Sequence, residues 1–585
     1  MRSRKSQNLL QGASILGASI IIVKLVGAVF KIPLGSILDG EGLGYYSTAY
    51  SIFSMIFAFS TAGLPAAVAK MVAEQSVRQR YQDIRRIHSL SIRLFVIMGI
   101  AGFVLMAAFS PLYVWLASDN QGALWSVLAI SPAILFGCMT SAYRGYYEGL
   151  RDMKPTAVSQ IIEVFAKLIF GLALSGGVLL LANHQFESSG VVFGHAAATE
   201  AEMRHYAMPF AAAAAILGVT ISTFVGTLYL MLVDRRRSDG ITEEDLRYSP
   251  RPIRTRVLLV QLIKIAIPIS LSSIVINVAQ FIDTFTIINR LDDAFTAHPD
   301  QMLAIFGGLV PENLLAVEGG AANFIYGAYA GYALSVFNLV PSFTAIFGKS
   351  ALPNITAAWS AHDRKATWVN IQSVIRMTCL IAMPASLGIL AMSQPILSLL
   401  YPARVAEVAI AAPVLSLQGI SLIFLGLSSP LFAVLQGLGR ADLPPKFMLV
   451  GAILKFVVNW VSIGIPEINV QGAAAGTVSC YATILILSLI WLHKITGFRI
   501  HFIRLTYKTL IASILCAVTA YSLHRWVMGA VLGEGGFNTL LSIGCGALVY
   551  LAALLLLRGI SKDDVLMLPK GEKFAKLLAK YHLLG

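Results

Sequence analysis

The chain has 585 residues, of which 57% are hydrophobic and only 13% are charged. Soluble domains carry about 25% charged residues, so this composition excludes a water-soluble globular protein. The net charge of +14 does not indicate a nucleic-acid partner, because the basic residues cluster where a membrane topology places them.

Apolar runs long enough to cross a bilayer recur along the whole chain. A helix needs about 20 residues to cross the hydrocarbon core, whereas a barrel strand needs about 10. The sequence therefore predicts an all-α polytopic membrane protein with 14 transmembrane helices. The predicted spans are 10–38, 45–70, 89–117, 122–148, 156–182, 207–233, 257–288, 323–350, 367–392, 405–436, 446–464, 473–492, 507–527 and 537–558.

Lysine and arginine gather in the N-terminus, in the loops that follow even-numbered spans and in the C-terminal tail. Cytoplasmic segments of membrane proteins carry this excess of positive charge. We therefore expect a multi-pass membrane protein with both termini in the cytoplasm.

A sequence motif occurs twice. EGLRDMKPTAVSQIIEVFAK at 148–167 is echoed by QGLGRADLPPKFMLVGAILK at 436–455, and the two copies are 288 residues apart. Each copy joins the fourth and fifth spans of its half, so Gly149, Pro155, Gly437 and Pro444 are expected to shape equivalent cytoplasmic turns.

An even number of spans separates the two copies, which predicts a parallel repeat of two six-helix lobes followed by two extra C-terminal helices. The expected parts are an N-lobe at 1–234, a cytoplasmic linker at 235–256, a C-lobe at 257–492, and the last two spans with a basic cytoplasmic tail at 493–585.

Ionisable residues inside the predicted spans are the candidate functional residues. A charge at the bilayer centre costs about 2.5–3.5 kcal/mol on insertion scales, so it usually faces a cavity or a partner. Lys24 and Lys31 are seven residues apart, which places both on one helix face. The alternative for Lys31 is that its side chain reaches the outer interface.

The remaining intramembrane charges lie in other spans. Glu163 and Lys167 have the i,i+4 spacing of a helical ion pair, and the alternative is that this pair only serves packing. Lys455 is the counterpart of Lys167 in the second lobe. Asp283 is a lone acid that indicates cavity exposure or binding of a coupling cation.

No pattern of an enzyme or of a resident cofactor was found. GKS at 348–350 lacks the upstream glycine of a phosphate-binding loop, and no HExxH zinc motif occurs. The His and Glu residues of GHAAATEAEMRH at 194–205 fit no standard metal-ligand spacing, so a solvated loop is the favoured interpretation. We expect no catalytic, cofactor-binding or metal residues; energy would come from a coupling cation, Na⁺ or H⁺, or from the membrane potential.

Three segments resemble a known family: DGEGLGYYSTAYSIF at 39–53, GLPAAVAKMVAE at 63–74 and RGYYEGLRDMKPTAVSQIIE at 144–163. They are similar to the polysaccharide-exporter branch of the multidrug/oligosaccharidyl-lipid/polysaccharide exporter superfamily. Within it, they look most like the group of stage V sporulation protein B and the lipid II flippases of Gram-positive bacteria.

The resemblance implies a cavity between two lobes, alternating access, and a cargo of undecaprenyl-pyrophosphate-linked sugar carried from the inner to the outer leaflet. It also implies basic residues in spans one and five, where Lys24 and Lys167 stand. Family members commonly carry arginine there, and lysine lacks its bidentate fork.

The sequence therefore predicts a lipid-linked saccharide flippase, with lipid II as the expected cargo and Lys24, Lys31, Lys167, Glu163 and Lys455 as substrate-binding residues. Its expected partners are the cargo, the bilayer and cell-wall synthesis proteins. One alternative is a cation-coupled drug exporter of the same superfamily, which the basic intramembrane charges disfavour. Another is a membrane scaffold for cell-wall synthesis, which needs no charged cavity.

Overall fold

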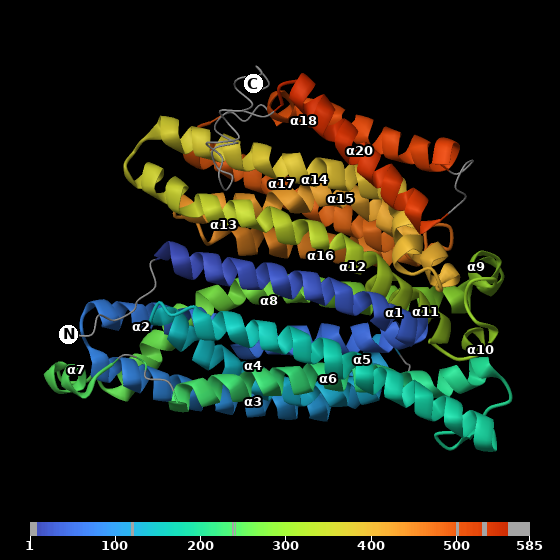
Figure 1. The fold of residues 1–585 in the computed structure, drawn as a ribbon, viewed down its shortest axis with the longest axis horizontal. Helices are drawn as coiled ribbons and strands as arrows, with labels where there is room; N and C mark the ends of the chain where they lie inside the picture. Colours follow the sequence, from blue (N-terminus) through green and yellow to red (C-terminus); the bar gives the residue numbers. More distant parts are fainter. Residues whose placement is uncertain are drawn as a thin grey trace. The chain divides into compact units, whose positions relative to one another are not determined.

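A computed structural model shows a chain built almost entirely from α-helices (Figure 1). It describes residues 9–61, 63–118, 122–236, 239, 241–498, 502–528 and 535–559, so the predicted basic tail from residue 560 lies outside the described residues. The prediction of a mainly helical membrane protein is confirmed.

In the first half of the chain, the elements are α1 (Leu9–Thr61), α2 (Leu64–Val77), α3 (Tyr81–Ser118), α4 (Ala123–Gly149), α5 (Lys154–Ser189), β1 (Val191–Val192), β2 (His195–Ala196), α6 (Glu200–Arg236), α7 (Glu243–Tyr248) and α8 (Thr255–Ala297). The strands β1 and β2 pair antiparallel in a short hairpin between α5 and α6.

In the second half, the elements are α9 (Pro299–Phe306), α10 (Glu312–Leu315), α11 (Gly320–Gly327), the π-helix η1 (Ala328–Ala333), α12 (Leu334–Phe337), α13 (Leu339–Ser360), α14 (Arg364–Leu400), α15 (Val405–Gly437), α16 (Leu443–Ile463), α17 (Gln471–Thr496), α18 (Phe502–Ser522), the π-helix η2 (Leu523–Met528) and α20 (Gly536–Leu556). The helices α9 and α10 occupy part of the predicted outer loop at 289–322.

Among the described residues, 11 helical segments are long and apolar enough to cross a membrane. The first of them, Ile15–Val77, has 63 residues and covers the first two predicted spans. The predicted spans 257–288 and 323–350 correspond to α8 and to the run from α11 to α13, which are not among the 11. The count of 14 spans therefore stays a prediction.

The first predicted loop, at 39–44, is a kink inside α1. Asp39 has a φ of 51°, which interrupts the helix. Its carboxylate then accepts hydrogen bonds from the backbone N–H groups of Glu41, at 3.0 Å, and Gly42, at 3.2 Å. A side-chain acceptor of this kind caps a helix start, so the chain resumes its helix at once.

The break between α1 and α2 lies inside the predicted span 45–70, and no break was predicted there. Gly63 has a φ of 76°, and Pro65 follows in the first turn of α2. Glycine adopts this left-handed conformation without steric cost, and proline is favoured at the start of a helix. These two residues end one helix and begin the next.

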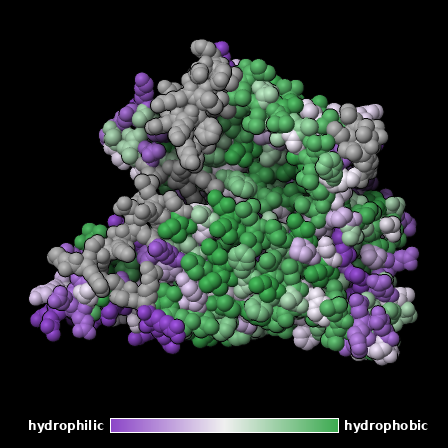
Figure 2. Space-filling view, viewed as in Figure 1, coloured by the Kyte–Doolittle hydropathy of each residue, from purple (hydrophilic) through white to green (hydrophobic). Residues whose placement is uncertain are grey.

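The packing divides the chain into two compact units: residues 1–292 with 310–327, and residues 293–309 with 328–585. In the first unit, α5 packs along α6, and α4 packs against α3 and α6. On the face shown in Figure 2, hydrophobic residues cover the middle of the first unit and hydrophilic residues lie toward its ends. The predicted lobe boundaries follow the repeat and not this packing, and they stay a prediction.

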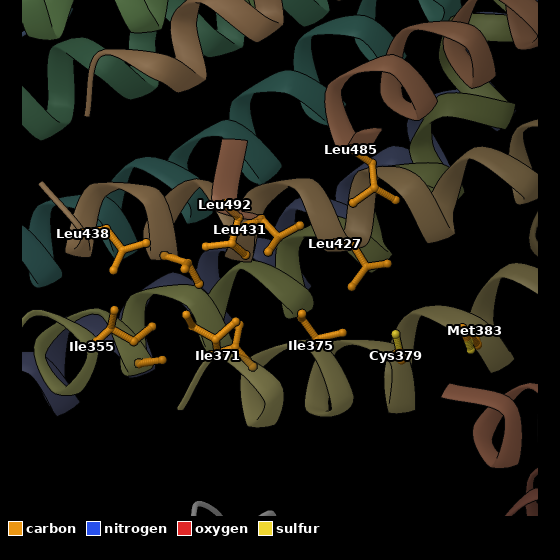
Figure 3. Packing of buried hydrophobic residues seen from close by; sticks show 13 residues of the cluster. Ile355, Ile371, Ile375, Cys379, Met383, Leu427, Leu431, Leu438, Leu485 and Leu492 are labelled. Carbon is orange, nitrogen blue, oxygen red and sulfur yellow. The ribbon is translucent and has the colours of Figure 1, made fainter. Parts of the chain in front are cut away.

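A cluster of aliphatic side chains forms the core of the second unit (Figure 3). Its members come from α13, α14, α15 and α17, and Ile355, Ile371, Leu431 and Leu492 are among those buried in it. The C-terminal helices α18 and α20 pack on α14, where the Tyr550 hydroxyl donates a hydrogen bond to the Leu380 carbonyl at 2.7 Å.

The two turns of the predicted repeat have the same backbone hydrogen bonds. In each, three successive N–H groups donate to carbonyls four, three and five residues earlier. The donors in the first turn are Leu150, Arg151 and Asp152, and those in the second are Leu438, Gly439 and Arg440. The middle donor has a positive φ in both turns, 60° at Arg151 and 81° at Gly439. The same hydrogen bonds also follow helices at 78–80, 361–363 and 557–559, so this is a common helix C-cap and the repeat stays a prediction.

Candidate functional site

Lys31 lies close enough to both Lys24 and Lys167 for their charges to interact. Lys24 is exposed on α1 and Lys31 is half-buried two turns later. Both Lys167, on α5, and Lys24 exert Coulombic repulsion on Lys31. The structure thus brings these three predicted residues into one cationic group within the first unit, which we call the lysine cluster.

Aromatic rings of α1 contact the ammonium group of Lys167. The Nζ atom lies 5.0 Å from the ring centroid of Phe30, 5.3 Å from that of Tyr50 and 6.0 Å from that of Tyr46. A cation over an aromatic face gains about 0.5–2 kcal/mol, more where water is excluded. These rings stabilise the charge of Lys167 without neutralising it.

Small residues allow α1, α5 and α6 to approach one another at this point. A Cβ atom at Gly171 of α5 would lie 2.9 Å from the Phe30 ring, and Gly171 is also in backbone contact with Gly218 of α6. The Ser19 hydroxyl, further toward the start of α1, donates a hydrogen bond to the Gln160 side chain of α5 at 3.3 Å. The glycines therefore set the position of the Phe30 ring beneath Lys167.

Glu163 does not use the i,i+4 partner that its spacing suggested. Its Oε1 atom forms an ion pair with Nη2 of Arg144, on α4, at 2.8 Å. The Arg144 Nε atom donates a hydrogen bond to the Ser159 hydroxyl at 3.0 Å. The expected pair of Glu163 with Lys167 is thus replaced by a pair between helices, because α4 brings a guanidinium within reach of the carboxylate.

Sequence reasoning missed Arg144 and the three rings around Lys167. Arg144 lies inside the predicted span 122–148, and this position was itself a signal, since an arginine in a span usually has a partner. The rings had no comparable signal, because aromatic residues on a transmembrane helix most often serve packing.

Asp283 belongs to a different polar group of the first unit. It lies on α8 and is 6% exposed, and its charge acts on Tyr326 of α11. The neighbouring Thr284 hydroxyl donates to the Ser51 hydroxyl at 2.8 Å and forms a 2.8 Å hydrogen bond with the Tyr326 hydroxyl. This group ties α8 and α11 to α1.

Lys455 lies in the second unit, on α16, and is 6% exposed. It is buried where α16 packs closely against α17. A Cβ atom at Gly476 of α17 would lie 3.2 Å from the Lys455 carbonyl oxygen. Lys455 therefore has a more enclosed environment than Lys167, its counterpart in the repeat.

The turn residues and the histidine-containing loop also have defined places. Gly149, Pro155, Gly437 and Pro444 are all buried at helix ends. In the loop, His205 lies at the start of α6, and its Nδ1 atom is 2.9 Å from Oε1 of Glu41. The same oxygen accepts a hydrogen bond from the Tyr45 hydroxyl at 2.9 Å. His205 thus contacts α1 and is not a freely solvated loop residue.

Comparison with solved structures shows that this helical membrane protein has the fold of MOP-superfamily transporters. A multidrug resistance MATE family transporter of this superfamily, solved in an inward-facing conformation, has a TM-score of 0.59 at 14% identity, covering 81% of this chain and 95% of that one. The lipid II flippase MurJ, solved in an inward closed conformation, has a TM-score of 0.56 at 13% identity, covering 92% and 98%. At such low identity, the similarity establishes the fold alone.

Sequence comparisons point to a narrower group. A family model described as "Polysaccharide biosynthesis protein" matches residues 9–194, and one described as "Lipid II flippase MurJ" matches residues 316–542. The chain is 23% identical to stage V sporulation protein B of Bacillus subtilis (strain 168), over 96% of this chain and 98% of that protein. It is 22% identical to the lipid II flippase MurJ of the same organism, over 93% and 95%. The resemblance to the polysaccharide-exporter branch is thereby confirmed.

Proposed function

We propose that the protein is a flippase that moves an undecaprenyl-pyrophosphate-linked saccharide, with lipid II as the first candidate, from the inner to the outer leaflet by alternating access. The observation that carries this proposal is the lysine cluster, in which Lys24, Lys31 and Lys167 gather positive charge inside a membrane fold. The names of the relatives support the same class of cargo.

In this proposal, the lysine cluster attracts the pyrophosphate, and the polyprenyl tail stays in lipid. Ammonium groups are effective phosphate partners because each supplies several charge-assisted donors around a point charge. Lys167 keeps its charge available because its neighbours on α1 are rings. Glu163 shapes the site from one turn before Lys167 on α5. Lys455, which lies in the second unit, is a weaker candidate for binding the cargo.

The proposed transport includes no covalent step, so the protein is not an enzyme and needs no resident cofactor. Energy comes from a cation or proton bound at Asp283, or from the membrane potential, which supplies about 2.3 kcal/mol per charge per 100 mV. The excess of lysine and arginine in alternate loops supports cytoplasmic termini. Cell-wall synthesis proteins that supply or consume the cargo are the proposed partners.

A cation-coupled drug exporter with the same fold is the alternative. A pump for cationic drugs favours an acidic cavity, because like charges repel the substrate. The lysine cluster has the opposite sign. A scaffold for cell-wall synthesis would not depend on this cluster at all.

The test is leaflet exchange in proteoliposomes. Purified protein is reconstituted with a fluorescent undecaprenyl-pyrophosphate saccharide, and exchange is followed with a membrane-impermeant quencher, with and without an imposed potential. We expect exchange by the natural protein and none by Lys24→Ala, with both folded to the same extent. Normal exchange by folded Lys24→Ala would remove Lys24 from the site. No exchange by the natural protein would move the proposal to another cargo, and resistance of overexpressing cells to cationic drugs would be measured next.

A further inference from the structure

The ion pair of Arg144 and Glu163 lies one helical turn from Lys167. We propose that Arg144 is a positioning residue: it holds the Glu163 carboxylate away from Lys167, so that the Lys167 ammonium remains available to the anionic head group of the cargo. This inference rests on the proposed function and adds a residue that acts on the lysine cluster without belonging to it.

Without another partner, Glu163 and Lys167 would be expected to pair. Residues four apart lie on the same helix face, and a glutamate that precedes a lysine by four residues has the favourable orientation. In a membrane, such a pair would be strong, because little water competes for either charge. It would cancel one of the three charges of the lysine cluster and weaken its attraction for an anion.

Two contacts keep the carboxylate with Arg144. The Glu163 Oε1 atom lies 2.8 Å from the Arg144 Nη2 atom, and the Arg144 Nε atom is held at 3.0 Å by the Ser159 hydroxyl. Ser159 is fully buried and in turn donates to the Thr156 carbonyl at 2.8 Å. Ser159, a residue of α5, therefore fixes the guanidinium of Arg144, which belongs to the neighbouring helix α4.

The helix α6 provides the space that Glu163 occupies. A Cβ atom at Gly226 would lie 2.5 Å from Cγ and 2.8 Å from Cδ of Glu163, closer than real Cβ contacts. Any larger residue at this position would displace the carboxylate. Three helices thus determine the direction of the Glu163 side chain, while Lys167 lies over the rings of α1.

The test measures binding of a fluorescent short-chain polyprenyl-pyrophosphate disaccharide to the full-length protein in nanodiscs. We expect Arg144→Gln to weaken binding by about tenfold, a usual size for coupling between neighbouring charges, because the released carboxylate neutralises Lys167. Glu163→Gln should bind at least as tightly as the natural protein. The double variant should recover the affinity of Glu163→Gln, which a merely structural role of Arg144 does not predict.

Gly226→Ala provides an independent variant that keeps both charges. We expect weaker binding from displacement of the carboxylate, and recovery when Glu163→Gln is added. The matched control is the exposed pair of Arg78 and Glu74, which has the same 2.8 Å distance between Nη2 and Oε1. Arg78→Gln should leave the affinity unchanged.

Lys167→Gln separates failure of the inference from failure of the proposed function. If it does not weaken binding, the proposed site is wrong and the inference falls with it. A second outcome is that Lys167→Gln weakens binding but the double variant of Arg144→Gln and Glu163→Gln binds no more tightly than Arg144→Gln. The proposed site is then supported, and the positioning role of Arg144 is overturned. If Gly226→Ala alone binds normally, the positioning role is likewise overturned.

Discussion

Lys167 and Lys455 occupy equivalent places in the repeat but have different surroundings. Each lies 18 residues after the Gly-Leu pair of a turn with the same backbone hydrogen bonds. Lys167 is half-buried over the rings of α1 and near two other lysines, whereas Lys455 is 6% exposed beside α17. The two turns share a common helix C-cap, whereas the neighbouring helices give the two lysines different surroundings.

The largest expected effect is a difference between the two lysines in transport. Lys167→Gln should lower the initial rate of leaflet exchange by about tenfold to a hundredfold, the value of one charge-assisted hydrogen bond. Lys455→Gln should lower it less, because the enclosed Lys455 side chain has less access to the head group of the cargo. Exchange by both variants is measured in the same proteoliposomes at equal protein density. Equal losses of exchange rate in the two variants would contradict the expected difference between Lys167 and Lys455. Both lysines would then contribute equally to transport.

A smaller effect is expected from the turns themselves. Gly439→Ala should lower stability by about 1–2 kcal/mol, because a Cβ atom is disfavoured at a φ of 81°. Arg151→Gly at the equivalent position should change stability by less than about 0.5 kcal/mol, since relief of strain is offset by the greater freedom of glycine in the unfolded chain.

Midpoints of thermal unfolding in detergent measure both effects. Gly177→Ala is the control, because this glycine lies within α5 with no heavy atom within 4 Å of a new Cβ. A loss of stability in Arg151→Gly as large as that in Gly439→Ala would contradict this prediction. It would show that the positive φ does not determine the stability of the first turn.

The smallest effect concerns charge at the second turn. Hydrogen bonds from Arg440 and Lys446 hold the pKa of the Asp442 carboxylate below its usual range. A carboxylate with a lowered pKa in the folded state contributes stability above its ordinary pKa of about 4, and this contribution is lost as the pH falls through the folded-state value. The pair is solvent-exposed, so the contribution is small.

Asp442→Asn should therefore slightly reduce stability at pH 7, and this loss should shrink progressively as the pH falls below about 4, toward the lowered pKa of the folded-state carboxylate. Thermal midpoints across this pH range measure the difference. A difference that grows as the pH falls would contradict the assigned cause. The effect should also shrink in high salt, as expected of exposed charges.

Much of the fold was predictable because its signals are local. Apolar runs of about 20 residues indicate membrane helices, since the bilayer leaves the backbone no other way to satisfy its polar groups. The repeated Gly-Leu motif correctly indicated two similar turns, because hydrogen bonding within a turn depends on residues close in sequence. The kink at Asp39 coincides with the predicted end of the first span at residue 38. The break at Gly63 was not predicted, since one left-handed glycine outweighs the average hydropathy of a window.

The candidate site was only partly predictable. The seven-residue step from Lys24 to Lys31 and the basic position at Lys167 could be recognised along one chain. The pair of Arg144 with Glu163 and the rings beneath Lys167 required three-dimensional contacts between α1, α4, α5 and α6. An i,i+4 rule describes an isolated helix. It failed for Glu163 because a neighbouring helix offered the guanidinium of Arg144, which a hydrogen bond to Ser159 holds in place.

Hydropathy, charge asymmetry and the repeat were thus sufficient to indicate a helical membrane protein and the residues that carry charge within it, because these properties follow from the transfer of single segments from water to lipid. Which of those charges are paired, which remain available and which are enclosed was decided by helix packing. Glycines such as Gly171 and Gly226 set how closely the helices approach, and this spacing determines the partner of each charged side chain.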